Sequence, residues 1–226
     1  VSLAQIKRAA AVTNRETGGL PDRIADAVIR ACDEIIAGRL HEEFIVDPIQ
    51  GGAGTSANMN ANEVIANRAI ELLGGEKGDY SVVHPNDHVN MSQSTNDVFP
   101  TAGKLTMLRL LPALTGELLR LAEALEKKAV EFDDVVKMGR TQLQDAVPVR
   151  LGQEFAAWAC AARRDIARLK KAQDERRCLN LGGTAIGTSL NASPDYVSHI
   201  TEHLQEVCGI ELSQAGNLID GTQNLD

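Results

Sequence analysis

Hydroxyl side chains occur in three short polar segments of the sequence, each next to a predicted helix. The segments are residues 51–56, with Thr55, residues 93–97, with Ser94 and Thr95, and residues 139–145, with Thr141. Hydrogen bonds to a charged acceptor contribute about 1.5–3 kcal/mol each, so several hydroxyl and N–H donors can together hold a carboxylate without an arginine. Such donors also stabilise the charge that spreads onto a carboxylate when a base removes a neighbouring proton. If the three segments converge, the sequence therefore predicts an enzyme that catalyses an elimination on a small anion.

The glycine-rich segment 51–56 offers backbone N–H groups and the positive end of a helix dipole, which together bind anions. It is not a phosphate loop, because no lysine follows the last glycine and no buried strand precedes it. It also lacks the third glycine of a dinucleotide-binding fingerprint. The alternative is a structural role, in which Thr55 or Ser56 caps a helix after a tight turn. Residues 93–97 permit the same alternative.

Histidine pairs occur twice, and for both we favour a structural interpretation. His199 and His203 fit the H-x-x-E-H pattern of some zinc proteases, but a catalytic zinc needs a third protein ligand and no supporting helix pattern follows. His84 and His88 flank a turn, where such residues hold loop geometry more often than they bind a ligand. We therefore expect no metal site.

The net charge argues against several classes of partner. Acidic side chains outnumber basic ones by 31 to 23, so the formal charge of −8 repels nucleic acid and anionic lipid surfaces. A site for an anion must overcome this field with local positive potential from Arg, Lys or backbone N–H groups. No apolar run approaches the roughly 18 residues that cross a bilayer, and the first residues do not have the pattern of a signal peptide. We expect a cytoplasmic protein with reduced cysteines and no membrane or nucleic-acid partner.

Apolar residues recur every three or four positions over much of the chain, which predicts helices. The predicted helices span residues 21–37, 57–73, 112–134, 149–177 and 194–208, and the chain also begins within a helix. Residues 44–46 and 82–83 are too short to build a sheet. The predicted class is all-α, an elongated bundle of long helices with a core of Leu, Ala, Ile and Val. Small residues at positions 156, 157 and 159–161 favour an oligomer, although alanine is also simply the best helix former.

Four segments together resemble the aspartase/fumarase superfamily. The motifs that carry the resemblance are GGAGTSANMN with NEV at 51–64, HPNDHVN at 84–90, QSTND at 93–97 and GRTQLQDAVP at 139–148. They occur in order, and the match covers essentially the whole chain. The resemblance implies an L-aspartase-like helical fold, a homotetramer in which each active site combines residues from three subunits, and no cofactor.

The resemblance also implies which residues contact a small dicarboxylate substrate. The implied contacts are Thr55, Ser94, Thr95, Asn96, Thr141 and Gln142, and the turn with His84, Asn86 and Asp87 resembles a secondary anion site of the fumarases. By the same resemblance, residues 1–91 form the C-terminal part of the N-terminal helical domain. Residues 92–226 then form the first part of the central helical-bundle domain.

Gln142 favours the ammonia-lyase branch of the superfamily. The fumarases carry a histidine after the Arg-Thr pair, whereas Gln142 resembles the aspartate ammonia-lyases. Hydroxide is a poor leaving group that needs a general acid, but an ammonium group departs as ammonia without one, so a neutral glutamine suffices. The implied reaction converts L-aspartate to fumarate and ammonia by anti elimination through an aci-carboxylate. The alternatives are a class II fumarate hydratase and, from another class, a non-catalytic helical assembly module.

The superfamily's catalytic base is a serine in a flexible loop of the type GSSxMPxKxN. No such loop occurs before Asp226, and the opening segment of the N-terminal domain has no counterpart either. We therefore expect an internal portion of a longer enzyme, inactive by itself, whose catalytic base lies outside these residues.

Overall fold

The computed structural model describes residues 1–224 and confirms the all-α class, since 63% of the chain is helical. The chain forms two compact units, one of residues 1–106 with the residues from Arg176 onward, and one of Met107–Glu175. The domain boundary expected near residue 91 concerns the domains of the superfamily fold and stays a prediction. Within residues 1–224, no helix is long and apolar enough to cross a membrane.

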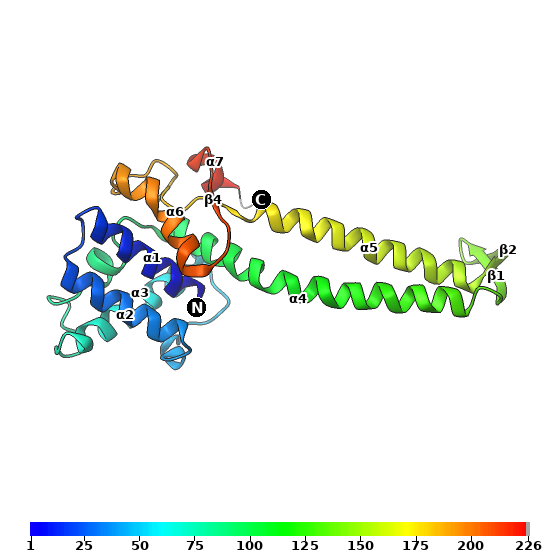
Figure 1. Cartoon of the computed structure of the whole chain (residues 1–226), viewed down its shortest axis with the longest axis horizontal. Helices are drawn as coiled ribbons and strands as arrows, with labels where there is room; N and C mark the ends of the chain where they lie inside the picture. The colour runs from blue at the N-terminus through cyan, green and yellow to red at the C-terminus, as the bar shows by residue number, and fades with distance from the viewer. Residues whose placement is uncertain (225–226) are drawn as a thin grey trace. The chain divides into compact units, whose positions relative to one another are not determined.

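The first unit is built from short and medium-length helices. Its elements are α1 (Ser2–Glu16), α2 (Asp22–Ile36), η1 (His41–Glu43), η2 (Gly52–Gly54), α3 (Thr55–Leu72), η3 (Pro85–Val89), the start of α4 (Thr95–Glu131), β3 (Cys178–Leu179), α6 (Pro194–Cys208), β4 (Ser213–Gln214) and α7 (Leu218–Gln223). Helix α1 packs against both α2 and α6, and α2 packs against α3 (Figure 1). The two short strands β3 and β4 pair in parallel.

Small aliphatic side chains fill the core of the first unit. Its fully buried members include Ala25, Val28, Ala31, Ile35, Ile65, Ala66, Ala69 and Ile70. The predicted core of aliphatic residues is therefore confirmed. Alanines on facing helices let the backbones approach closely, so any polar side chain between these helices must find its hydrogen bonds inside the protein.

The second unit is a helical hairpin. The long remainder of α4 runs beside α5 (Leu151–Glu175), and the antiparallel strands β1 (Val136–Thr141) and β2 (Gln144–Arg150) join them (Figure 1). Near this end, the ring centroid of Phe155 lies 5.4 Å from that of Phe132 and 5.0 Å from that of Trp158. Several apolar side chains of the unit are exposed, with Leu110 at 64% and Val130 at 81%. Isolated exposed apolar residues are common, but a series along one hairpin marks a surface that a partner can cover.

Two sequence predictions about this unit were wrong. The helix expected at residues 112–134 begins earlier, at Thr95, and continues through Pro100 and Pro112. Proline has no N–H group to donate within a helix, so these two residues favoured a prediction in which the helix starts later. Residues 139–145 are not a loop before a helix but the tip of the β1–β2 hairpin. The two residues of its turn, Gln142 and Leu143, have φ values of 50° and 62°. Such turns normally carry Asn or Gly, so neither residue signals one.

Gly152, in the first turn of α5, is needed where the hairpin closes. A Cβ atom there would clash with the carbonyl oxygen of Ala129 and lie 2.9 Å from the Cα atom of Asp133. We expect Gly152→Ala to destabilise the second unit by about 2 kcal/mol, because backbone rather than a mobile side chain must move. Urea unfolding followed by the fluorescence of Trp158, the single tryptophan, measures this unit directly.

Gly116→Ala is the matched control, because a Cβ atom at Gly116 on α4 meets nothing within 4 Å. Alanine is the better helix former, so this variant should be more stable by about 0.5–1 kcal/mol. Equal effects of the two substitutions would contradict the steric argument.

Candidate functional site

The first turn of α4 is fixed by a reciprocal capping arrangement. The N–H of Asn96 donates to Ser94 Oγ at 3.2 Å, and the N–H of Ser94 donates to Asp97 Oδ1 at 2.9 Å. This is the capping box that residues 93–97 permit, with Asp97 in the place of the usual Glu or Gln. The structural role of this segment is therefore real, and it places the hydroxyl groups of Ser94 and Thr95 at the positive end of α4.

Asp97 also holds a second segment against this helix end. Its Oδ2 atom accepts hydrogen bonds from the N–H groups of Gly182 at 3.2 Å and Thr184 at 2.9 Å. Burial raises the pKa of the Asp97 carboxyl above its ordinary value, whereas the N–H groups of Ser94 and Thr184 and the charge of Lys7 act in the opposite direction. The glycine-rich segment 181–188 thus becomes part of the site's framework.

Asn96 is tied to the same segment by both its side chain and its backbone. Its Nδ2 atom donates to the carbonyl oxygen of Ala185 at 2.7 Å, and its carbonyl oxygen accepts from Asn180 Nδ2 at 3.0 Å. The Asn96 side chain remains exposed to solvent. One amide hydrogen is therefore engaged with Ala185, and the other is available to a ligand.

Thr95 is connected to the interior through a relay of amides. Asn58 Nδ2, on α3, donates to Thr95 Oγ1 at 3.1 Å and to Asn90 Oδ1 at 3.2 Å. Asn90 Oδ1 also accepts from Asn62 Nδ2 at 3.2 Å and from Lys7 Nζ, on α1, at 2.7 Å. Because the Thr95 oxygen accepts from Asn58, its hydroxyl hydrogen is left to donate elsewhere.

Thr55 begins α3 but does not cap it. Its hydroxyl donates to the carbonyl oxygen of Gly52 at 3.1 Å, and α3 has no capping hydrogen bond from Thr55 or Ser56. Instead, the N–H of Ala57 donates to Gln50 Oε1 at 3.1 Å. The capping role considered for Thr55 and Ser56 is therefore wrong, because the glutamine before the turn performs it.

Gly54 brings the start of α3 close to the start of α4. Gly54 has a φ of +84°, and a Cβ atom there would lie 2.6 Å from the ring of Phe99 on α4. Together with the Asn58–Thr95 hydrogen bond, this close approach puts the first turns of α3 and α4 side by side. Of the predicted contacts, Thr55 and the 94–96 group therefore share one region of the first unit.

Thr141 and Gln142 lie at the tip of the β-hairpin in the second unit. Both are exposed, and next to them Arg140 Nε donates to Asp145 Oδ1 across the hairpin at 3.2 Å. The positive φ of Gln142 is a sparsely populated backbone conformation for such a residue, and conformations of this kind are frequent at functional sites. Convergence of this segment with the other two stays a prediction.

The histidine turn at 84–88 is internally hydrogen-bonded. His84 Nδ1 accepts from the N–H groups of Asn86 and Asp87, both at 3.2 Å, and His88 Nδ1 accepts from the N–H of His84 at 2.9 Å. Burial lowers the pKa of His88. These contacts give the turn a local structural role, and the secondary anion site stays a prediction.

The other histidine pair links two helices. His203 on α6 contacts Thr13 Oγ1 through Nδ1 at 2.8 Å and Glu16 Oε2 through Nε2 at 3.2 Å, both on α1. Among residues 1–224, no group of three or more His, Cys, Asp or Glu side chains is placed to hold a metal ion.

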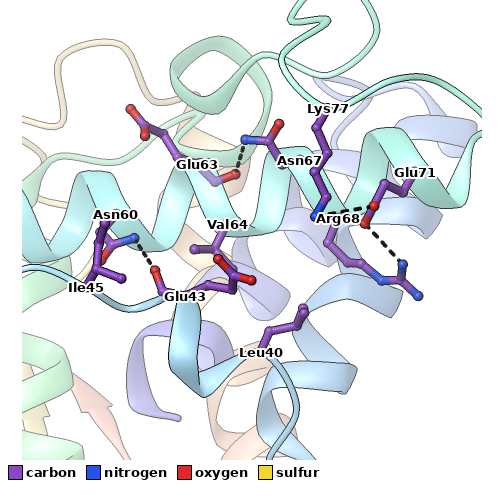
Figure 2. A pocket seen from close by; sticks show the side chains of 10 residues that line it. All are labelled: Leu40, Glu43, Ile45, Asn60, Glu63, Val64, Asn67, Arg68, Glu71 and Lys77. Carbon is purple, nitrogen blue, oxygen red and sulfur yellow. Dashed lines mark hydrogen bonds and ion pairs between the residues drawn. The ribbon is translucent and has the colours of Figure 1, made fainter.

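A separate pocket of about 230 Å³ lies along α3, and none of the predicted contacts lines it (Figure 2). Charged side chains line it. Arg68 is paired with Glu34 at 2.7 Å and with Glu71 at 3.2 Å, and Lys77 lies 3.4 Å from Glu71, whereas Glu43 and Glu63 add two further carboxylates. Because both cations are already paired and the other charged side chains of the lining are acidic, the pocket offers no strong attraction for an anionic ligand.

Sequence reasoning missed Lys7 and gave Asp97 no role of its own. Lys7 stands among the apolar positions Leu3, Ile6 and Ala10 of a predicted helix, and a lysine on a buried helix face is unusual. A lysine among these apolar positions was the signal that could have identified it. The signal for Asp97 was weaker: it lies three residues after Ser94, a possible helix cap.

Known proteins resemble this chain over nearly its whole length. The Lyase_1 family, described as lyases, matches residues 2–226. The chain is 52% identical to the aspartate ammonia-lyase of Bacillus subtilis over 100% of its length and 47% of that protein. It is 45% identical to the aspartate ammonia-lyase of Escherichia coli over 98% of its length and 47% of that protein. The chain thus spans about half the length of these relatives.

Solved structures show the same fold. One is a fumarate lyase:delta crystallin from Brucella melitensis, with a TM-score of 0.90 and 54% identity over 98% of this chain and 48% of that one. Another is a class II fumarase from Schistosoma mansoni, with a TM-score of 0.86 and 35% identity over 97% of this chain and 49% of that one. With the family match extending over almost every residue, the chain belongs to the Lyase_1 family of lyases, within the aspartase/fumarase superfamily.

Proposed function

We propose that the protein is an ammonia-lyase that converts L-aspartate to fumarate and ammonia. The observation that carries the proposal is the first turn of α4, which presents Ser94, Thr95 and Asn96 at a helix N-terminus and on a buried polar framework. Proteins named aspartate ammonia-lyase that match the whole chain at 52% and 53% identity support the same substrate.

The chemistry proposed for these residues is stabilisation of negative charge. A base takes a proton from the carbon beside one carboxylate of L-aspartate, and the electron pair spreads onto that carboxylate as an aci-carboxylate. The pair then forms the carbon–carbon double bond, and ammonia leaves from the opposite face in an anti elimination. Donors such as the Thr95 hydroxyl bind the doubly charged intermediate more tightly than the ground state, which lowers the barrier. The base is proposed to be a serine that has no counterpart in these residues.

We propose that the active site is composite and forms in a homotetramer. The exposed apolar side chains of the second unit, such as Leu110 and Val130, are suited to pack against further copies. In such an assembly Thr141 and Gln142 of one copy would complete the site that Thr55 and Thr95 begin in another. Light scattering of the full-length protein tests the assembly, and a monomer would overturn it.

A class II fumarate hydratase is the second candidate, supported by the structural likeness to the Schistosoma mansoni fumarase. The two reactions are separated by absorbance in the fumarate band when the full-length protein receives L-aspartate or L-malate. We expect fumarate from L-aspartate only. Fumarate from L-malate alone would overturn the ammonia-lyase proposal.

Gln142→His tests why a neutral residue suffices at the hairpin tip. A protonated histidine can give the departing hydroxide its proton, so the variant of the full-length protein should gain measurable dehydration of L-malate, by roughly 10²-fold over the parent. Gln144→His, two residues further along the same hairpin, is the control and should gain none. If Gln142→His gains no activity on L-malate and keeps full deamination, the leaving-group argument is wrong.

The 226-residue chain alone is proposed to be inactive, because the superfamily's loop serine has no counterpart in it. Purified material of this length, given L-aspartate under conditions in which the full-length protein is active, should produce no fumarate above the uncatalysed rate. Measurable turnover would contradict the assignment of the base to that loop. A third possibility, a helical module without catalysis, would leave the full-length protein inactive as well.

A further inference from the structure

Lys7 is a fully buried lysine on α1 that the proposed reaction does not yet use. None of its surface is exposed, and its ammonium group donates to Asn90 Oδ1 at 2.7 Å. Taking an ammonium group out of water costs several kcal/mol unless its surroundings compensate. A hydrophobic residue would fill this position between α1 and its neighbours more cheaply, so the charge calls for a reason beyond folding.

The hydrogen bonds of Lys7 lead to one of the proposed substrate contacts. Lys7 and Asn58 both donate to Asn90 Oδ1, and the second hydrogen of the Asn58 amide goes to Thr95 Oγ1. Asn90 Nδ2 in turn donates to the carbonyl oxygen of Gln93 at 3.3 Å. Turning the Asn90 amide over would point its NH₂ group at three donors, Lys7, Asn58 and Asn62. The two amides could turn over in response, but an ammonium group has no acceptor to offer, so Lys7 locks this orientation. The locked amides keep the Thr95 oxygen as an acceptor and leave its hydrogen for a ligand.

The positive charge of Lys7 also favours the binding of an anion at the site. The protein carries a formal charge of −8, which repels a dicarboxylate before it arrives. A positive charge in the interior is screened far less than one at the surface, so it acts over a longer range. Asp97, also buried, is the main opposing charge that acts on Lys7, and three backbone N–H groups donate hydrogen bonds to its carboxylate.

We propose that Lys7 is a positioning residue for the dicarboxylate ligand: it orients the Thr95 hydroxyl through Asn90 and Asn58, and its positive charge attracts a carboxylate to the first turn of α4. The proposal rests on the proposed function for the class of ligand, but not for the reaction that follows binding.

The charge state of Lys7 makes this role dependent on pH. Burial lowers the pKa of Lys7 to about 7, and the charge of Asp97 on α4 acts to raise it. A bound dianion stabilises the charged lysine, so affinity for the ligand must fall as pH rises past 7. Among the buried or half-buried titratable groups on elements packed against α1 are Cys32 on α2, Tyr196 and His203 on α6, and His88 on η3. Burial raises the pKa of Cys32 and of Tyr196, so these two stay neutral over the same range.

The test measures succinate binding by calorimetry between pH 6.5 and 9 on the full-length protein. Succinate is a dicarboxylate without a leaving group, so binding is read without turnover. We expect the parent to lose affinity by up to about tenfold per pH unit above 7. Lys7→Met should bind succinate roughly tenfold or more weakly at pH 6.5, with no dependence on pH over the range. Its melting temperature should not be lowered, which separates the proposed role from a purely structural one.

Arg8→Met is the matched control. It removes the same formal charge from the next position of α1, where Arg8 is partly exposed and paired with Asp33 at 2.7 Å. Affinity should stay within about twofold of the parent, with the pH profile unchanged, because solvent screens this charge. A second variant, Asn58→Ala, breaks the relay and leaves the charge, so it should weaken binding while keeping the pH profile.

Each outcome decides the proposal. It is overturned if Lys7→Met binds succinate as tightly as the parent does, or if the parent binds succinate equally from pH 6.5 to 9. It is also overturned if Lys7→Met keeps the parent's pH profile, because a histidine would then be the titrating group. It is also overturned if the parent does not bind succinate. Failure of the proposed function looks different: succinate binding depends on Lys7, but L-aspartate gives no fumarate.

Discussion

Asp97→Ala should lower the free energy of unfolding of the first unit by about 3–5 kcal/mol. The substitution leaves the N–H groups of Ser94, Gly182 and Thr184 without their acceptor in a buried region, and it removes a negative charge that faces Lys7. Each unsatisfied buried donor alone costs about 1–3 kcal/mol. The segment that begins near Gly182 should separate from the start of α4, so activity of the full-length protein should fall as well.

The measurement for Asp97→Ala is urea unfolding of the chain, followed by far-ultraviolet circular dichroism. Asp26→Ala is its control, because the Asp26 side chain is 64% exposed and its ion pair with Arg15 lies at the surface. The free energy of unfolding of Asp26→Ala should differ from that of the parent by no more than about 1 kcal/mol. If the two alanine variants unfold at the same urea concentration, Asp97 does not hold the two segments together.

Lys7→Met should make the protein more stable near neutral pH, by an amount on the order of 5 kcal/mol that disappears at high pH. Burial lowers the pKa of Lys7 from 10.5 in the unfolded chain to about 7 in the folded one. Between these values the unfolded chain binds the proton that the folded protein releases, so the stability of the parent rises with pH through this window. Methionine does not titrate, so its advantage is full below about pH 7 and lost above 10.5.

Urea midpoints of the parent and Lys7→Met at pH 7, 8, 9 and 10 measure this linkage. The difference between the two proteins should shrink steadily over the series, since all other titrating groups are common to both. A constant difference would show that the lysine keeps its ordinary pKa in the folded protein. Together with the succinate experiment, a gain in stability and a loss in binding would show that this buried charge is retained for function at a cost in stability.

Local patterns in the sequence predicted the local features of this protein. The spacing of apolar residues predicted α2, α3, α5 and α6 to within a few residues, since helix periodicity and helix stops are properties of adjacent positions. The same criteria failed where a residue departs from its usual preference. Pro100 and Pro112 lie inside α4, and Gln142 and Leu143 turn a hairpin in left-handed conformations, so the beginning of α4 and the strands β1 and β2 were missed.

Sequence also indicated which residue types could bind a carboxylate, because hydroxyl and amide donors are chemical properties of single side chains. It determined neither which donors are occupied nor what supports them. Only the tertiary structure shows that Asp97 joins residues 182 and 184 to the start of α4, and that Lys7 reaches Thr95 through Asn90 and Asn58. These contacts join positions more than thirty residues apart. They form because the packing of the helices brings a buried charge and its hydrogen-bond partners together. No local sequence pattern encodes that packing.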